Sequence, residues 1–246
     1  MKRRFEKWVR SRKCYLYLFL GTAIAFLLAR VSGSKVFFPA LLTLVIYPVY
    51  ALDLSQGRRD LAFFHTLFWA FVSSVCMILL VRYDDGGMAK VVFKGIEYRD
   101  EMFQWILTGE GKEGNIRLFL PEHLKHFIIF CTSAFFTAGV WGLAFGSLLL
   151  NYMNFYVGSL SLHSRDPLLA SIVGWPPWSV LRATGFVLCG IALSEPLLAQ
   201  LLRFRMDRRR CYQYFFAGLG FVIADILLKA NMASFWRDLL RRLVTL

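Results

Sequence analysis

Long apolar runs recur along the 246-residue chain, and they constrain its fold more than any other feature. A run of about eighteen or more apolar residues can cross the hydrocarbon core of a bilayer, which is roughly 30 Å thick. Inside lipid the backbone polar groups must be satisfied within the protein, so such runs must be helical. The charged fraction of 18% is below the roughly 25% of soluble domains. The sequence therefore predicts an all-α, multi-pass transmembrane helical bundle that forms one domain over residues 1–246.

The charge of the chain is unevenly distributed, and this bears on its partners. The net charge is +13, but residues 83–125 hold six basic and eight acidic residues, so the rest of the chain carries +15. That excess lies mainly in short segments beside the apolar runs, as the positive-inside rule describes. We therefore expect the lipid bilayer, and no nucleic acid, as a partner.

Seven basic residues lie within Met1–Lys13, which predicts a cytoplasmic N-terminus in the cell (inner) membrane. The first apolar run lacks a small-x-small cleavage site, so we expect an uncleaved first helix. About six to seven membrane segments are expected from the lengths of the runs. The runs that predict crossings are Tyr15–Val31, Val36–Leu52, Leu61–Val81, Phe127–Leu150, Pro177–Leu202 and Cys211–Lys229.

Residues 83–125 follow three predicted crossings, so we expect them to be non-cytoplasmic. Asp84–Gly87 is typical of a turn, and Lys90–Lys94 is short enough for a strand. An amphipathic helix should follow, because four apolar residues share one of its faces, and it should lie on the outer membrane surface or cap the bundle. These residues are Ile96, Phe103, Ile106 and Leu107.

The C-terminal segment, residues 234–246, predicts a second amphipathic helix that lies in the membrane interface. Phe235, Leu239 and Leu243 share one face, and the arginines lie elsewhere. Such a helix favours anionic lipid headgroups, as do the other basic segments.

Small residues recur at every fourth position in the predicted crossing Phe127–Leu150. On one helix they would form a smooth ribbon that lets another helix approach closely, which drives association in lipid. The partner is a helix of the same chain or, alternatively, a second copy. The ribbon consists of Ala134, Ala138, Gly142 and Gly146.

A break is predicted at Trp175-Pro176-Pro177-Trp178, because two prolines interrupt an apolar region. The clusters Arg58/Arg59 and Arg203–Arg210 should both be cytoplasmic, so an even number of crossings must separate them. Either the segment 167–202 is re-entrant, or residues 151–162 complete an additional crossing. A third alternative is that one basic loop lies outside.

Polar residues within the apolar runs are costly, and they mark candidate sites. The candidates are Asn151, Asn154, Arg182, Glu195 and Asp225. We expect Arg182 and Asp225 to pair, or to line one polar cavity with Glu195. The alternative is that Asp225 pairs with Lys229 at i+4 and Arg182 extends to the headgroups.

Evidence for catalysis or metal binding is sparse in the sequence. His123 and His126 share a helical turn with Glu122, but further ligands do not cluster with them, so we expect no metal site and no cofactor. With His163 they are the candidates for an intramembrane enzyme. The five cysteines are odd in number and suggest no disulfide framework. Cys14 and Cys211 lie beside basic segments, as palmitoylated or simply interfacial cysteines do.

The region around the predicted break carries a family resemblance. Asn151 or Asn154 closes a helix rich in small residues, Gly158 follows, and Pro177-Trp178-Ser179-Val180-Leu181-Arg182 opens another. This arrangement resembles the stage II sporulation protein M family, whose pattern is a helix ending Asn-Gly followed by Pro-His-Gly-Val-Leu-Glu. Here an aromatic residue follows the asparagine, and Trp, Ser and Arg replace His, Gly and Glu. The resemblance covers the second half of the chain and implies a bundle that assembles cell-wall-remodelling proteins at the membrane.

Three classes of function fit these features. We expect a membrane scaffold or assembly subunit without catalysis of its own, which binds a membrane protein partner or a second copy. The first alternative is a small transporter or channel with its polar site at the broken helix. The second alternative is an intramembrane lipid-modifying enzyme.

Overall fold

The computed structural model describes residues 12–245, so the predictions for residues 1–11 lie outside the described residues. Over the described part every regular element is a helix, as the sequence predicts, apart from one isolated bridge between Ser164 and Val244. The helices are α2 (Arg12–Ser32), α3 (Phe37–Ser55), α4 (Arg59–Val91), α5 (Gly95–Thr108), α6 (Ile116–Phe136), α7 (Val140–Leu162), α8 (Pro167–Val173), α9 (Pro177–Leu202) and α10 (Arg208–Leu243). Five of them, α2, α3, α4, α9 and α10, are long and apolar enough to cross a membrane.

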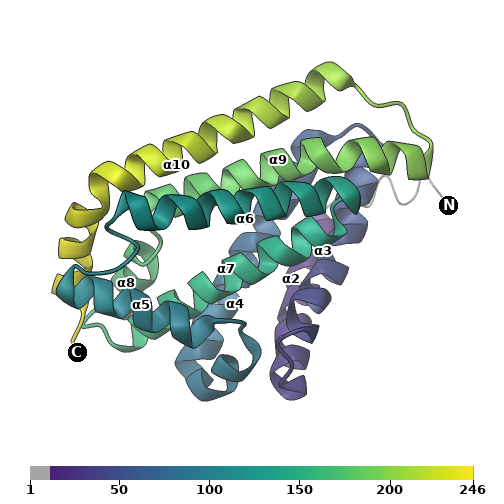
Figure 1. Ribbon diagram of the computed structural model, residues 1–246. Coiled ribbons are helices and arrows are strands. Elements are labelled where there is room, and N and C mark those ends of the chain that lie inside the picture. Colours follow the sequence, from purple (N-terminus) through teal and green to yellow (C-terminus); the bar gives the residue numbers. More distant parts are fainter. Residues whose placement is uncertain (1–11, 246) are drawn as a thin grey trace.

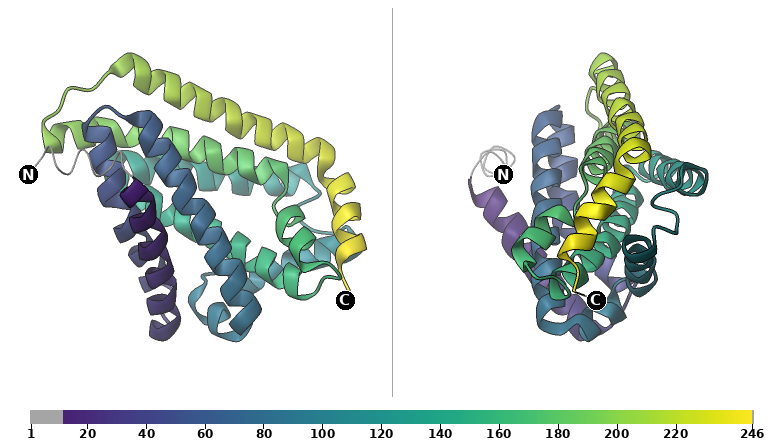
Figure 2. Two further views of the ribbon diagram at one scale, coloured as in Figure 1. Left: turned by 180° about the vertical axis from the view of Figure 1, so that it is seen from behind. Right: turned by 90° about the vertical axis from the view of Figure 1, so that its left-hand side faces the viewer.

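Helix α7 connects two groups of helices. It packs against α3 and α4 on one side and against α5 and α6 on the other. Helices α6, α9 and α10 run alongside one another, and α2, α3 and α4 form the second group (Figures 1 and 2). The α3–α4 turn and the α9–α10 loop lie at one end of the bundle, which we call the basic end (Figure 1). Helix α5 and the C-terminal end of α10 lie at the opposite end.

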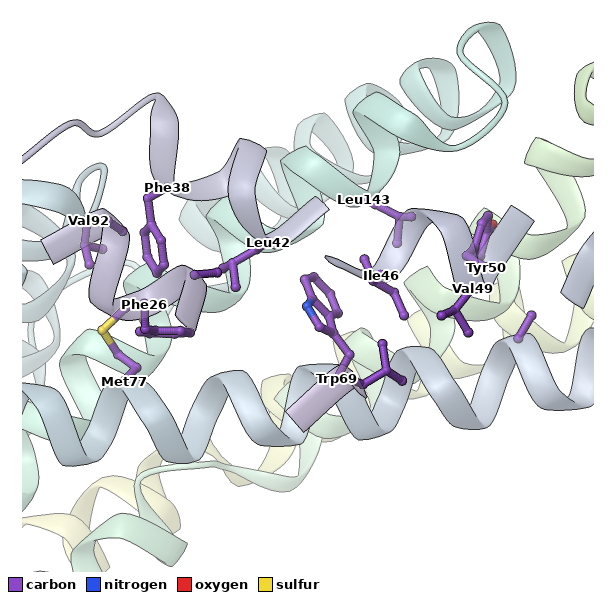
Figure 3. Close-up of a cluster of buried hydrophobic side chains, with 14 of the residues drawn as sticks. Phe26, Phe38, Leu42, Ile46, Val49, Tyr50, Trp69, Met77, Val92 and Leu143 are labelled. Atoms are coloured by element: carbon purple, nitrogen blue, oxygen red, sulfur yellow. The ribbon is translucent and has the colours of Figure 1, made fainter. Parts of the chain in front are cut away.

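The largest apolar core lies between α2, α3 and α4. Phe26 and Phe38 pack edge to face with ring centroids 4.9 Å apart, and Trp69 lies among the aliphatic side chains of α3 (Figure 3). Leu143 of α7 joins this cluster and so connects it to the helix that links the two groups. Because lipid offers no hydrophobic driving force, these contacts stabilise the bundle mainly through close packing.

The predicted crossing Phe127–Leu150 is wrong as a single helix, because the chain reverses within it. Helix α6 ends at Phe136, and α7 begins at Val140. Between them Ala138 and Gly139 adopt left-handed φ angles of 50° and 93°, which end one helix and start the next. A Cβ at Gly139 would lie 2.6 Å from the Ser194 Oγ, so only glycine fits at this position.

The small residues therefore face one another across a hairpin and do not form one ribbon. A Cβ added to Gly142 would lie 2.7 Å from the Ala134 Cβ, and one added to Gly146 would lie 3.3 Å from the Phe130 ring. Helices α6 and α7 can approach this closely because these side chains are absent or small. The partner of the small-residue surface lies in the same chain.

The α6–α7 hairpin also bears on where the two arginine clusters lie in the bundle. Between Arg59 and Arg203 the chain now traverses the bundle in α4, α6, α7 and α9, which is an even number of passes. Arg59 Nη2 lies 3.4 Å from the Asp207 carbonyl oxygen, so both clusters lie at the basic end. The added pass is α7, whose second half contains residues 151–162. The Trp-Pro-Pro-Trp stretch separates the short helix α8 from α9, which begins at Pro177.

The strand predicted at Lys90–Lys94 is wrong. Helix α4 continues to Val91 after a kink at Asp84, where φ is −154° and ψ is 75°. The Asp84 Oδ1 accepts a hydrogen bond from the Gly87 N–H at 2.9 Å and so starts a new helical turn. A helix, α5, forms where the amphipathic helix was predicted, but a different face of it is buried. Its buried side chains include Met102, Trp105 and Ile106, whereas Ile96 and Leu107 are exposed.

The predicted last crossing and the predicted C-terminal helix form one element, because α10 continues unbroken from Arg208 to Leu243. Its final turns bend towards α8 (Figure 1). There the Trp236 indole donates a hydrogen bond to the Val173 carbonyl oxygen at 3.0 Å, and Leu240 is buried. Of the face predicted from the sequence, Phe235 is exposed, whereas Leu239 and Leu243 are half-buried.

Candidate functional site

The first pair of buried charges joins α9 to α10. Arg182 Nε and Nη2 donate to the two carboxylate oxygens of Asp225 at 3.0 and 3.1 Å. Asp225 is almost fully buried, whereas 21% of the Arg182 side chain remains exposed. A bidentate arginine–carboxylate pair is among the stronger polar contacts in proteins. The structure thus contains the Arg182–Asp225 pair that the sequence predicts.

Lys229 does not pair with Asp225 as the alternative prediction had it. Its Nζ lies 2.8 Å from Glu113 Oε2, in the loop after α5, and 4.5 Å from the centroid of the Phe119 ring. The lysine is fully buried, and 12% of the Glu113 side chain is exposed. A buried ammonium requires a charged partner, and the loop supplies it. The loop therefore reaches into the bundle at this point.

His123 of α6 completes this group of polar side chains. Its Nδ1 lies 4.0 Å from Asp225 Oδ2 and has no hydrogen-bond partner among the described residues, although 90% of the side chain is buried. Buried polar atoms in folded proteins usually have a partner, which is often a water or a ligand. Lys229 at least has the Glu113 carboxylate beside its buried nitrogen, whereas the nearest charged atom to His123 Nδ1 among the described residues is 4.0 Å away.

A charged cavity of about 390 Å³ lies beside these residues, between α5, α6, α9 and α10. Five cationic side chains line it: Lys94, Lys112, Lys125, Arg182 and Lys229. Four carboxylates line it as well: Glu97, Glu101, Glu113 and Glu122. Most of these residues come from residues 83–125, which the sequence had indicated only as an acidic cap.

An apolar cleft of about 110 Å³ adjoins the charged cavity and extends between the α6–α7 hairpin and α9. Phe130, Gly142, Gly146, Phe186 and Gly190 are among the residues that line it. The glycines keep this cleft open because they have no side chain. A Cβ at Gly190, for example, would lie 3.0 Å from the Phe130 ring.

The cleft and the cavity share part of their lining, so they form one site with a charged and an apolar part. The shared residues are Tyr98, His123, His126, Tyr152 and Arg182.

Tyr98 of α5 lies where the two parts meet. Burial, together with the nearby Glu113 carboxylate, raises the pKa of the Tyr98 phenol well above its ordinary value. The phenol is therefore neutral at physiological pH and keeps its O–H donor. Its ring packs against Tyr152 with centroids 4.6 Å apart. The two tyrosines form the wall between charged and apolar space.

Glu195 does not join this site, so the predicted cavity shared by Arg182, Asp225 and Glu195 is wrong. The Glu195 carboxylate accepts two hydrogen bonds from the Arg59 guanidinium, one of them from Nε at 2.7 Å. The Cys211 Sγ donates to the same carboxylate at 3.1 Å. In the sequence Arg59 indicates only orientation. The signal that could have identified its role is the Glu195 carboxylate in the last turns of an apolar run, which requires a cation nearby.

The other predicted polar residues lie outside the site. Asn151 and Asn154 are buried in α7 and line neither the cavity nor the cleft. The Asn151 Nδ2 donates to the Ser147 carbonyl oxygen at 2.8 Å, one helical turn away. His163 caps α7, with its Nδ1 2.8 Å from the Ser159 carbonyl oxygen.

Metal-ligand clustering is absent from the described residues, where no three His, Cys, Asp or Glu side chains could hold one ion. His126 and Glu122 lie 4.0 Å apart, and both line the cavity. Cys14 and Cys211 are buried in the structure.

The fold and the composition define the class of protein. A helical bundle with five helices long and apolar enough to cross a membrane is an integral membrane protein. No protein-family model, curated protein or solved structure matches the chain.

Proposed function

We propose that this chain is a multi-pass protein of the cell membrane that binds a membrane amphiphile, with the headgroup in the charged cavity and an acyl chain in the apolar cleft. The observation that carries the proposal is the lining shared by the two spaces. An amphiphile has one charged and one apolar end, and this site offers both in contact. A small polar solute would leave the cleft unused.

The orientation proposed for the protein places the basic end in the cytoplasm. Arg58, Arg59 and the cluster Arg203–Arg210 gather at that end, and cytoplasmic loops carry such an excess of arginine and lysine. The cavity would then open towards the non-cytoplasmic side. Helices α6 and α7 traverse the bundle with the five apolar helices, which supports seven passes and a non-cytoplasmic C-terminus.

Cysteine labelling tests this orientation. Glu110→Cys and Arg205→Cys place thiols at exposed positions at opposite ends of the bundle. A membrane-impermeant thiol reagent should label Glu110→Cys in intact cells and Arg205→Cys only after permeabilisation. The parent protein, whose native cysteines stay in place, supplies the background. The reverse pattern would contradict the orientation.

Lipid retention tests the proposed binding. The protein should carry stoichiometric lipid through purification in detergent, quantified by mass spectrometry of the extract. Gly146→Leu fills the cleft beside Phe130 and should lower the retained lipid about tenfold, which corresponds to roughly 1.4 kcal/mol. Leu148→Phe enlarges a neighbouring residue that lines neither space and is the matched control. Equal lipid in both variants, at equal melting temperature, would refute the proposal.

A scaffold role is the second candidate, and α10 supports it. Only 22% of the most apolar stretch of α10 is buried in the bundle, against 56% of the corresponding stretch of α9. Phe216, Ile223 and Leu227 are exposed along α10, and a Cβ at Gly220 would meet nothing within 4 Å. A partner helix could pack closely on this surface. Cysteine crosslinking from Gly220→Cys in native membranes tests this role, because a lipid-facing surface gives no specific protein adduct.

The role implied by the resemblance to stage II sporulation protein M also stays a proposal, and the same crosslinking experiment tests it. The transporter alternative predicts flux of a solute in proteoliposomes. The enzyme alternative predicts turnover of the bound lipid that depends on His123 or His126, because both line the cavity. Lipid that is retained without flux or turnover would leave binding as the function.

A further inference from the structure

The charges around the cavity are balanced. Five lysine and arginine side chains and four glutamates line it, and Asp225 lies directly behind Arg182. Cations and carboxylates are therefore equal in number. An anionic headgroup would add to the carboxylates, and a cationic one would add to the lysines, so either would leave a charge uncompensated in a partly desolvated space. A headgroup with both charges avoids this cost.

We propose that the headgroup bound in this cavity is zwitterionic and carries a primary ammonium and a phosphate, as an aminophospholipid does. This inference rests on the proposed function and specifies its ligand. It predicts that the two charges of the headgroup contact different walls of the cavity.

Arg182 and His123 form the wall that binds the phosphate. Asp225 occupies Nε and Nη2 of Arg182, while Nη1 has no hydrogen-bond partner among residues 12–245 and the side chain remains partly exposed. The buried Nδ1 of His123 also has no partner there. A guanidinium N–H binds phosphate oxygens well, because the donor is charged and its plane is held by Asp225.

Glu97 and Glu101 form the wall that binds the ammonium. They lie one turn apart on α5, so both carboxylates project from the same face of the helix. Glu97 has no ion-pair partner among the described residues, and Glu101 has only a 3.4 Å contact with the exposed Lys112. An ammonium with three N–H donors can replace this weak contact.

Tyr98 lies between the two walls. Its neutral phenol provides a donor or an acceptor without adding charge, consistent with its raised pKa. The apolar cleft begins on the other side of the same tyrosine. A phospholipid therefore fits the site better than a soluble zwitterion, which has nothing to place in the cleft.

Binding to the full-length protein in delipidated detergent micelles tests the proposal. Phosphatidylethanolamine, phosphatidylglycerol and phosphatidylcholine with identical acyl chains are each titrated and followed by native mass spectrometry. We expect phosphatidylethanolamine to bind about tenfold more tightly than the other two, because phosphatidylglycerol has no ammonium and phosphatidylcholine has no N–H donors. Equal binding of all three would overturn the zwitterion proposal and leave the proposed function intact.

Two further outcomes separate the ligand sources. Binding of none of the three lipids would overturn the proposed function as well. Free glycerophosphoethanolamine carries the same headgroup without acyl chains and should compete at least a hundredfold more weakly than the lipid. Competition as strong as that of the lipid would identify a soluble zwitterion and would also overturn the proposed function.

A pair of matched double variants locates the selectivity. Glu97→Gln with Glu101→Gln removes two negative charges from the cavity wall. Asp100→Asn with Glu110→Gln removes two from the neighbouring surface, because neither residue lines the cavity. The first variant should lose the tenfold preference for phosphatidylethanolamine over phosphatidylglycerol, and the second should keep it. A preference that changes equally in both would overturn the assignment of the ammonium wall.

Discussion

Helix α9 carries two buried ion pairs thirteen residues apart, and they differ in what surrounds them. At the basic end Arg59 and Glu195 are 4% and 1% exposed, and they line neither the charged cavity nor the apolar cleft. At the opposite end Asp225 is equally buried, but its partner Arg182 opens onto the charged cavity.

This difference separates a structural pair from a binding pair. Arg59 uses Nε and Nη2 on Glu195 and reaches the Asp207 carbonyl oxygen, so it ties α4 to both α9 and the α9–α10 loop. The Arg182–Asp225 pair instead orients a guanidinium that keeps a free donor. Burial of an ion pair in lipid is costly in both places. Of the two arginines, only Arg182 lines the charged cavity, so its unused donor can reach a ligand there.

The largest expected effect comes from breaking the Arg59–Glu195 pair. Glu195→Ala leaves the Arg59 charge buried without a carboxylate partner and should lower the free energy of unfolding by about 3–5 kcal/mol. Unfolding in mixed detergent micelles measures it. Arg59→Met combined with Glu195→Leu should recover at least half of the loss, because an apolar pair carries no desolvation cost. A loss below about 1 kcal/mol in Glu195→Ala would remove the structural role.

Charge reversal at the Arg182–Asp225 pair should have a smaller effect on stability. Arg182→Asp and Asp225→Arg should each destabilise the protein, and the double swap should show a coupling of about 1–3 kcal/mol. The effect is smaller than at the basic end because water in the cavity can solvate the altered side chain. Additive effects in the cycle would argue against the pair. Arg182→Lys keeps the charge but should reduce lipid binding, which a purely structural pair would not do.

The close approach of α9 and α10 at Gly218 should keep the two ion pairs of α9 in position. A Cβ at Gly218 would lie 2.6 Å from the Cys189 Sγ and 2.8 Å from the Gly185 carbonyl oxygen, so Gly218→Ala should cost about 1–2 kcal/mol. Gly220→Ala is the matched control on the same helix and should stabilise by up to about 1 kcal/mol, because that position is open. Thermal unfolding compares the two. Equal melting temperatures would mean that the contact is not tight.

The smallest expected effect on stability lies at the rim of the cavity. Lys112 and Glu101 are 3.4 Å apart, and about half of the lysine side chain is exposed. Lys112→Gln should therefore change the free energy of unfolding by less than about 0.5 kcal/mol. The same change frees Glu101 and should strengthen phosphatidylethanolamine binding. A large change in stability would mean that the Lys112–Glu101 pair has a structural role, as the Arg59–Glu195 pair does.

The Arg182–Asp225 pair could be predicted because each charge lies deep in an apolar run and needs a partner there. The reversal at Ala138–Gly139 could not, because the sequence Phe127–Leu150 is as apolar and as rich in small residues as a continuous helix would be. At the reversal a Cβ on Gly139 would collide with Tyr50 and Ser194, residues of two other helices that the local sequence does not show.

The sequence by itself determined that this protein is helical and belongs in a membrane, since hydropathy and the need to satisfy backbone hydrogen bonds act locally along the chain. Only the tertiary structure decided which charges meet. Arg59 and Glu195 are 136 residues apart. Lys229 pairs with Glu113, which belongs to a loop that the sequence placed outside the bundle. Partners at such separation are selected by how the helices pack, and one turn at Ala138–Gly139 changes the direction of the chain that follows it. The charged cavity and the apolar cleft exist because of that packing.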